Sequence, residues 1–149
     1  MKSQLHFKEA TISDVSVILD LYNQPEFDSD GVLSEDDAQP IFDKISKYPS
    51  YKFYLAEWDD RVVGTFSLLV MDKLGHYGAP SAIVEDVVVS EKAQGQGIGK
   101  AMMQYARALA HEAGCYKMVL SSNQKRVLAH QFYESLGFTR HGYSFYVDI

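Results

Sequence analysis

The chain has 149 residues, of which 46% are hydrophobic and 23% charged, and its formal net charge is −6. This length and composition are typical of one globular domain, predicted to span 1–149, that can bury a single core. No apolar run approaches the ~20 residues that cross a bilayer, and the negative charge argues against nucleic-acid binding. The sequence therefore predicts a protein with no membrane and no nucleic acid as partner.

The start of the chain and its cysteine content indicate a compartment. Residues 1–6 lack the apolar stretch of a secretory signal. The single cysteine, Cys115, cannot form an internal disulfide, which suits a reducing environment. We therefore expect a cytoplasmic protein, and because no Cys/His spacing indicates zinc, we expect no metal.

Hydrophobic periodicity and turn residues predict ten elements in chain order. They are strand 5–9, helix 12–22, a helix capped by Ser34 that ends at Lys47, strands 51–58, 61–70 and 82–89, helix 97–113, strand 116–121, helix 127–136 and strand 144–147. This order predicts a fold of the α/β (α+β mixed) class, a mixed sheet with helices on both faces.

Six acids gather in the segment 26–37, which precedes the predicted hairpin. They are Glu26, Asp28, Asp30, Glu35, Asp36 and Asp37. Residues 1–60 carry 13 acids and 5 bases, whereas 61–149 carry 7 acids and 9 bases. The acidic half suits a cationic ligand and the other half an anionic one, although acids at a helix start also favour the helix dipole.

Three glycines lie between strand 82–89 and the following helix, in the run Gln94-Gly95-Gln96-Gly97-Ile98-Gly99-Lys100. A helix start offers unpaired backbone N–H groups and the positive end of the dipole, and glycines let a bulky anion approach that backbone. The run indicates a diphosphate cradle. Taken alone, it is equally typical of a tight turn between a strand and a helix.

The spacing distinguishes this loop from two common phosphate-binding loops. A Rossmann fingerprint would need a glycine in place of Lys100, and a P-loop would need one in place of Gln94 and Ser or Thr in place of Ala101. The failed P-loop pattern disfavours a nucleotide phosphotransferase.

The loop reads Gln94-x-x-Gly97-x-Gly99 and resembles the acyl-CoA signature [QR]-x-x-G-x-[GA] of the GCN5-related N-acetyltransferase (GNAT) family. Phe132-Tyr133 with Gly137-Phe138 resembles the family's later F-Y-x-x-x-G-F segment. The resemblance implies the GNAT fold, a central mixed, mostly antiparallel sheet flanked by helices on both faces, and acetyl-CoA as cofactor.

The resemblance also implies how the cofactor is held. The glycine loop would bind the pyrophosphate through its backbone, and the end of strand 82–89 would lend backbone groups to the pantetheine arm. The residues expected to bind acetyl-CoA are Val87, Val88, Val89, Gln94, Gly95, Gln96, Gly97, Ile98, Gly99, Lys100, Asn123 and Tyr133.

Tyr133 is the expected general acid, because a protonated phenol can donate to a departing thiolate. Glu85 and Asp86 are the expected acceptor-binding residues, and Glu85 is favoured as the catalytic base because family members often use a Glu on this strand. Strand alternation predicts that the two carboxylates point to opposite faces. A packed aromatic and a pair of solvent-facing acids are the rival interpretations.

The segments Ile83–Val89 and Gly114-Cys115-Tyr116-Lys117 resemble glucosamine-6-phosphate N-acetyltransferases. Those enzymes carry an acid in the next strand, in an L-D-C run, where this chain reads Leu120-Ser121-Ser122. This resemblance therefore predicts the reaction type of those enzymes and not their substrate.

The function predicted from these features is transfer of the acetyl group of acetyl-CoA to a primary amine of a small molecule, by direct attack in a ternary complex. A non-catalytic acyl-CoA-binding or regulatory module on the same fold is one alternative, and a protein or peptide N-acetyltransferase is another. A homodimer is a further hypothesis, because many family members pair through their late strands or helices. The aromatic final strand, which includes Phe145 and Tyr146, would form either such an interface or part of the core.

Overall fold

The computed structural model describes residues 4–24, 27 and 31–149, and the chain divides into two units, Met1–Val119 and Leu120–Ile149.

Glu26, Asp28 and Asp30 of the acidic segment lie outside the described residues. Glu35, Asp36 and Asp37 lie in the first turn of a helix whose start is capped by Ser34, which accepts from the Asp37 amide. These three acids therefore match the helix-dipole interpretation. The division of the chain into two units does not test the prediction that 1–149 form one domain.

The first unit is built on a five-stranded sheet in the order β1-β2-β3-β4-β5. Its first four strands are antiparallel neighbours, and β4 and β5 are parallel. The strands are β1 (Leu5–Glu9), β2 (Tyr51–Trp58), β3 (Arg61–Met71), β4 (Ser81–Val89) and β5 (Met118–Val119). The α-helices of this unit are α1 (Val15–Tyr22), α2 (Glu35–Ser46) and α3 (Ile98–Glu112), and short 3-10 turns span Ile12–Asp14, His76–Gly78 and Glu91–Ala93. The mixed, mostly antiparallel sheet confirms the predicted fold class.

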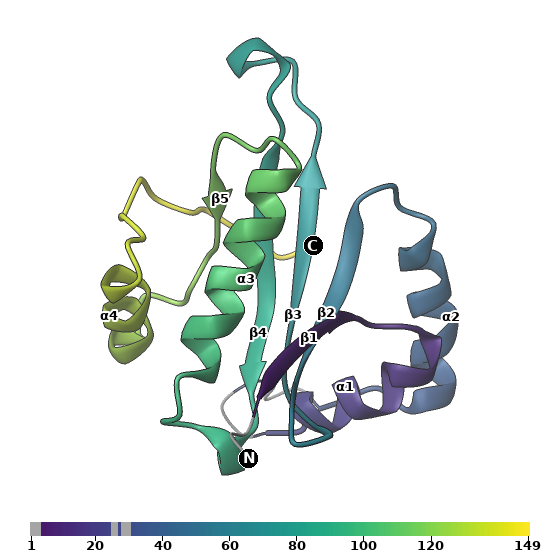
Figure 1. Ribbon diagram of the computed structural model, residues 1–149. Coiled ribbons are helices and arrows are strands. Elements are labelled where there is room, and N and C mark those ends of the chain that lie inside the picture. The colour runs from purple at the N-terminus through teal and green to yellow at the C-terminus, as the bar shows by residue number, and fades with distance from the viewer. Residues whose placement is uncertain (1–3, 25–26, 28–30) are drawn as a thin grey trace. The chain divides into compact units, whose positions relative to one another are not determined.

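Helices cover both faces of this sheet, because side chains on each strand alternate between two apolar layers. On one face, α3 packs on β3 and β4, as Figure 1 shows, and Tyr105 of α3 stacks on Phe7 of β1 with ring centroids 4.5 Å apart. On the other face, Phe53 and Leu55 of β2 belong to a buried cluster with Ile18 of α1. The sheet is thus the common wall of two cores.

The predicted hairpin of β2 and β3 is present, with Asp59 and Asp60 in its turn. Both have positive φ, 50° and 62°, as the two central residues of a tight hairpin turn require. The sequence pattern found this turn because two polar residues separate two apolar runs.

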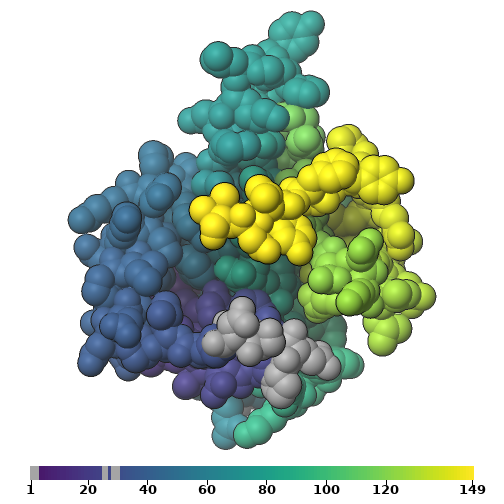
Figure 2. All heavy atoms as spheres, turned by 180° about the vertical axis from the view of Figure 1, so that it is seen from behind, coloured from purple at the N-terminus to yellow at the C-terminus, as the bar shows by residue number. Residues whose placement is uncertain are grey.

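The second unit contains one regular element, α4 (Val127–Ser135), among residues 120–149, all of which the structure describes. The strand predicted over 144–147 is therefore wrong. Its side chains are exposed and no strand of this unit lies beside it to supply hydrogen bonds. The strand predicted over 116–121 is also too long, since β5 has only two paired residues. Figure 2 draws the C-terminal residues in yellow.

Candidate functional site

The glycine loop lies between the 3-10 turn after β4 and the first turn of α3. Gly97 is the residue before the helix and has a φ of 79°, and Gly95 has a φ of 78°. A Cβ added to Gly95 or to Gly97 would meet no atom within 4 Å. The glycines are therefore required by the backbone conformation and not by packing against the protein.

The start of α3 is suited to an anion. The first intrahelical bond runs from the Ala101 amide to the Gly97 carbonyl, so the N–H groups of the three preceding positions have no partner within the helix. Ile98 is 2% exposed and fixes this turn to the core. Open space, free amides and the helix dipole together fit a diphosphate group.

Gln94 connects this loop to the strand before it. Its Nε2 atom lies 3.5 Å from the Val89 carbonyl oxygen at the end of β4. The residue immediately before it, Ala93, is buried and holds the turn in place. The loop is thus positioned from both sides, by β4 and by α3.

β4 extends well beyond its pairing with β5. The parallel ladder consists of Ala82 with Met118 and Ile83 with Val119, whereas β4 continues to Val89. The backbone at Val87 and Val89 is thus beyond the β5 ladder, where an extended ligand can pair with strand amides. Val88 is 5% exposed and is a core residue through its side chain.

The middle of β4 carries a β-bulge at the two predicted carboxylates. Thr65 pairs with Val88 and Ser67 pairs with Glu85, so one residue of β3 lies opposite two of β4. Asp86 has a φ of 52°, in the left-handed region. The strict alternation predicted for Glu85 and Asp86 therefore does not hold.

The carboxylates of Glu85 and Asp86 both raise the pKa of Tyr51. Burial raises the pKa of Tyr51, a hydrogen bond with Ser67 lowers it, and the charges of Asp86 and Glu85 raise it. Burial and the neighbouring Glu85 also raise the pKa of Asp86. The bulge therefore places two carboxylates near one tyrosine of β2, and one of them is a better proton acceptor than an ordinary Asp.

A second tyrosine of this region, Tyr22, ends α1. Burial raises its pKa strongly, and the charge of Asp86 adds to the effect. No sequence motif marks Tyr22 or Tyr51, because both have the pattern of aromatic residues on an apolar face. Only the bulge brings carboxylates to them.

The later motif lies in the second unit. Tyr133 of α4 contacts Phe132 and Phe138, with ring centroids 5.3 and 5.8 Å apart. Burial raises the pKa of Tyr133, and Arg126 lowers it by a smaller amount. Gly137, with a φ of 94°, ends the helix and turns the chain so that Phe138 meets the tyrosine ring.

Asn123 belongs to the loop before α4. Its Oδ1 accepts from the Lys125 amide at 2.9 Å, and its carbonyl bonds to His130 Nε2 at 2.8 Å. His130 is thus a residue that stabilises this loop. The cofactor contact predicted for Asn123 stays a prediction.

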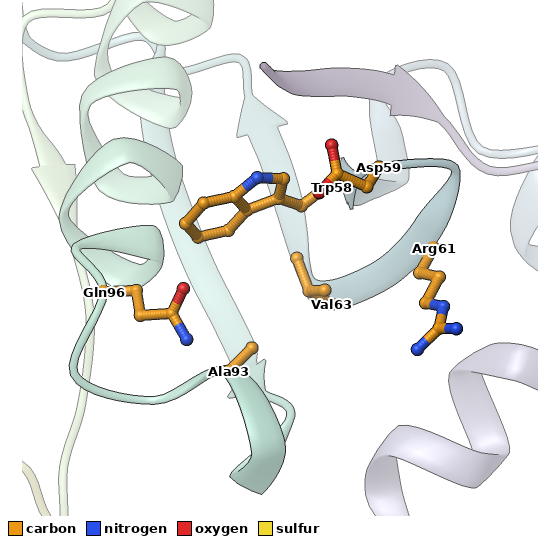
Figure 3. Close-up of a pocket in the computed structure, with 6 residues that line it drawn as sticks. All are labelled: Trp58, Asp59, Arg61, Val63, Ala93 and Gln96. Carbon is orange, nitrogen blue, oxygen red and sulfur yellow. The ribbon is translucent and has the colours of Figure 1, made fainter. Parts of the chain in front are cut away.

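A cavity of about 470 Å³ lies beside the glycine loop. Figure 3 shows its lining residues, Trp58, Asp59, Arg61 and Val63 from the β2–β3 hairpin together with Ala93 and Gln96. The indole nitrogen of Trp58 is buried and has no hydrogen-bond partner in the described part of the chain.

Neither a metal-binding cluster nor a membrane-spanning helix is found among residues 4–24, 27 and 31–149. No group of three or more His, Cys, Asp or Glu side chains there could hold a metal ion. No helix in the same residues is long and apolar enough to cross a membrane.

The chain spans only about half or less of the length of two curated relatives. A glucosamine 6-phosphate N-acetyltransferase of Trypanosoma brucei brucei is 36% identical over 89 residues, which cover 60% of this chain and 58% of that protein. A probable glucosamine 6-phosphate N-acetyltransferase of Drosophila melanogaster is 38% identical over 79 residues, 53% of this chain and 35% of the relative.

Solved structures match the chain over nearly its whole length. A structure from Agrobacterium tumefaciens has a TM-score of 0.90 at 29% identity and covers 97% of this chain and 99% of its own. A Trypanosoma brucei acetyltransferase has a TM-score of 0.82 at 28% identity, covering 98% and 100% of the two chains. The model of the acetyltransferase (GNAT) family matches residues 16–138. The glycine loop and the bulged β4 thus lie in a matched segment that spans most of the sequence, and the chain belongs to the GNAT acetyltransferase family.

Proposed function

We propose that this protein is an acetyl-CoA-dependent N-acetyltransferase that acts on a primary amine of a small molecule. The observation that carries the proposal is that β4 contains a bulge at the two carboxylates and then leads directly to the glycine loop. A β-bulge lies at Glu85 and Asp86, and the strand then leads into a glycine loop at a helix start, whose backbone N–H groups suit a diphosphate. Family membership supports acetyl-CoA as the acyl donor.

The glycine loop would bind the pyrophosphate of the cofactor through backbone N–H groups of Gly95, Gly97, Gly99 and Lys100. The backbone of Val87 and Val89 would pair with the pantetheine arm, and Asn123 would contact the same arm. Acetyl-CoA, when bound, supplies the acetyl group as a thioester.

Glu85 is the proposed base. The amine reaches the protein as an ammonium ion and must lose one proton before its nitrogen can form the new C–N bond. Glu85 takes that proton, directly or through a water molecule. Asp86 is the second candidate for this step, because burial and Glu85 raise its pKa.

Tyr133 is the proposed general acid. The Tyr133 hydroxyl would donate its proton to the sulfur atom that leaves the thioester. Burial raises the pKa of Tyr133, so the phenol stays protonated throughout the neutral range. The proton balance is complete, with one proton taken from the amine and one delivered to the thiol.

An amine panel with a free-thiol readout tests this function. Two members of the panel are glucosamine 6-phosphate and an aminoalkylphosphonate, because relatives are named for these substrates. Thiol release that depends on one amine supports the proposal. Tight CoA binding, seen by native mass spectrometry, without thiol release for any amine would favour the non-catalytic module, and release only with a peptide would favour a protein N-acetyltransferase.

A further inference from the structure

The side chain of Gln24 connects the end of α1 to the turn that precedes the glycine loop. Its Oε1 atom accepts from the Glu91 amide at 2.8 Å, and its Nε2 atom donates to the Leu21 carbonyl at 2.7 Å. The same nitrogen lies 3.5 Å from the Val89 carbonyl oxygen at the end of β4. Because Gln24 and Glu91 are 67 residues apart in the sequence, one amide group joins two distant segments of the first unit.

The two backbone groups that this amide binds lie at the ends of helical segments. Leu21 is in the last turn of α1, where carbonyl groups lack partners within the helix. Glu91 is the first residue of the 3-10 turn Glu91–Ala93, and the side chain of Ser90, at its N-cap, makes no capping hydrogen bond. Gln24 therefore supplies the acceptor that an N-cap side chain commonly supplies.

Gln24 is itself held in place by its neighbours. Its backbone amide donates to the Tyr22 carbonyl at 2.8 Å, and its carbonyl accepts from the Phe27 amide at 3.0 Å. The Phe27 ring stacks on the Tyr22 ring with centroids 4.5 Å apart. Leu21 is 7% exposed, so the end of α1 is fixed to the core. The bond to Glu91 therefore starts from a position that is already ordered.

The 3-10 turn determines where the glycine loop begins. The Ala93 amide donates to the Ser90 carbonyl at 2.9 Å and closes the turn, and Ala93 is 8% exposed. Gln94 follows directly, and its Nε2 atom lies 3.5 Å from the Val89 carbonyl oxygen. The side chains of Gln24 and Gln94 thus approach the same oxygen atom, one from α1 and one from the glycine loop.

The glycine loop has little packing of its own. A Cβ added to Gly95 or Gly97 would meet no atom within 4 Å, whereas Ile98, at the start of α3, is 2% exposed. The core therefore holds the later end of the loop, and the turn that bonds to Gln24 holds the earlier end. A loop with one end released would lose more conformational freedom when it binds a ligand, and its affinity would fall.

We propose that Gln24 is a positioning residue for the cofactor, because its bond to the Glu91 amide sets the conformation in which the glycine loop binds CoA. This inference rests on the proposed function for the role of the glycine loop, and it extends the cofactor site to a residue after α1. Gln24 acts through the turn and needs no contact with the cofactor.

Amide hydrogen exchange, followed by NMR on ¹⁵N-labelled protein without cofactor, tests this role. Gln24→Met keeps the length of the side chain and removes the amide donor and acceptor. We expect the Ala93 amide to exchange roughly tenfold faster than in wild type, because the loss of one hydrogen bond lets the turn open more often. The Ala113 amide, which bonds to the Leu109 carbonyl at the other end of α3, should keep its rate.

Gln24→Glu and Gln39→Met are the matched variants. Gln24→Glu keeps an acceptor oxygen at the same side-chain length, so the Ala93 amide should exchange at a rate closer to wild type than in Gln24→Met. Gln39 of α2 is exposed and donates to the Glu35 side chain at 3.3 Å. Gln39→Met removes the same kind of group from a different helix and should leave the Ala93 rate unchanged.

Calorimetry with CoA measures the effect on binding. We expect the Kd for CoA to rise roughly tenfold in Gln24→Met and to keep its wild-type value in Gln39→Met. An unchanged Ala93 rate in Gln24→Met, equal acceleration in Gln24→Glu and Gln24→Met, or an unchanged CoA affinity in Gln24→Met would each overturn the positioning role. The exchange rates need no cofactor, so a wild type that did not bind CoA would contradict the proposed function while those rates still decided the role of Gln24.

Discussion

Individual residues of the candidate site were partly predictable from the sequence. Glu85 and Asp86 stood out as adjacent acids on a strand, but their shared surroundings depend on a bulge that needs the pairing partner on β3 to be seen. Tyr22 has the spacing of a core aromatic. Its buried hydroxyl becomes informative only when the surrounding atoms are known.

Tyr133→Phe tests the acid at the residue scale. The substitution keeps the ring contacts with Phe132 and Phe138 and removes only the hydroxyl. We expect kcat to fall by roughly 10²–10⁴ at neutral pH with little change in KM, because the proton is needed mainly in the transition state.

The pH dependence of this deficit has a defined sign. Burial raises the pKa of Tyr133, so the wild type keeps its acid through neutral pH. At high pH the phenol begins to ionise and a thiolate leaves without help, so the two rates should converge. Full kcat of Tyr133→Phe across neutral pH, in an assay limited by chemistry, would show that the tyrosine only packs.

Asp86→Asn tests the electrostatics of the bulge through stability. The pKa of Asp86 is raised in the folded protein by burial and by Glu85, so the folded state binds more protons than the unfolded state between the two pKa values. Stability therefore decreases as pH rises through that window, and ionised Asp86 is unfavourable at neutral pH. Asn keeps a side chain that tolerates the positive φ.

We expect Asp86→Asn to melt at a higher temperature than wild type at pH 7 and at nearly the same temperature at low pH. Asp20→Asn, on the exposed side of α1, is the control and should show no such pH-dependent gain. A lower melting temperature of Asp86→Asn at pH 7 would mean that ionised Asp86 stabilises the fold. The gain at pH 7 should accompany lower activity, as is common when an unfavourable site residue is replaced.

At the scale of elements, long periodic segments were predictable and short ones were not. The helix start after the glycine loop followed from the run of apolar spacing in α3, and Gly97 lies at the expected boundary. β5 was overestimated because its apolar residues read as a longer strand, whereas only two of them have partners on β4.

Gly97→Val tests the cradle. Its φ of 79° costs a residue with a Cβ roughly 1–2 kcal/mol, and the side chain would enter the open space where the diphosphate is proposed to bind. We expect calorimetry to show CoA binding abolished while circular dichroism shows the fold retained.

Gly114→Val is the matched control for that variant. Gly114 follows the other end of α3 with a φ of 80°, and a Cβ there also meets no atom within 4 Å. It should lose similar stability and bind CoA normally. Wild-type affinity in Gly97→Val, or equal loss of affinity in both variants, would remove the cradle assignment.

At the scale of the whole molecule, the C-terminal residues stand out because their aromatic side chains are exposed. Tyr143, Phe145 and Tyr146 are 92%, 90% and 89% exposed, and the strand expected there is absent. Exposed apolar residues gathered in one segment often mark an interface. A strand needs a partner, and a second copy of the chain is the partner that we propose.

Light scattering tests the proposed homodimer. We expect a mass of about twice 16.8 kDa at micromolar concentration, and we expect Phe145→Asp with Tyr146→Asp to give the monomer mass. Tyr77→Asp, which charges another exposed aromatic side chain outside this segment, should leave the dimer intact. The monomer mass for wild type would exclude the dimer under these conditions.

The most direct test of the central claim follows a labelled acetyl group. The protein is mixed with [¹³C]acetyl-CoA and the best amine of the panel, and the products are resolved by mass spectrometry and NMR. We predict labelled amide on the amine nitrogen, one free thiol for each amide formed, and no acetyl group on the protein itself. Thiol release without labelled amide, or a labelled protein that passes its acetyl group to the amine, would contradict direct transfer in a ternary complex.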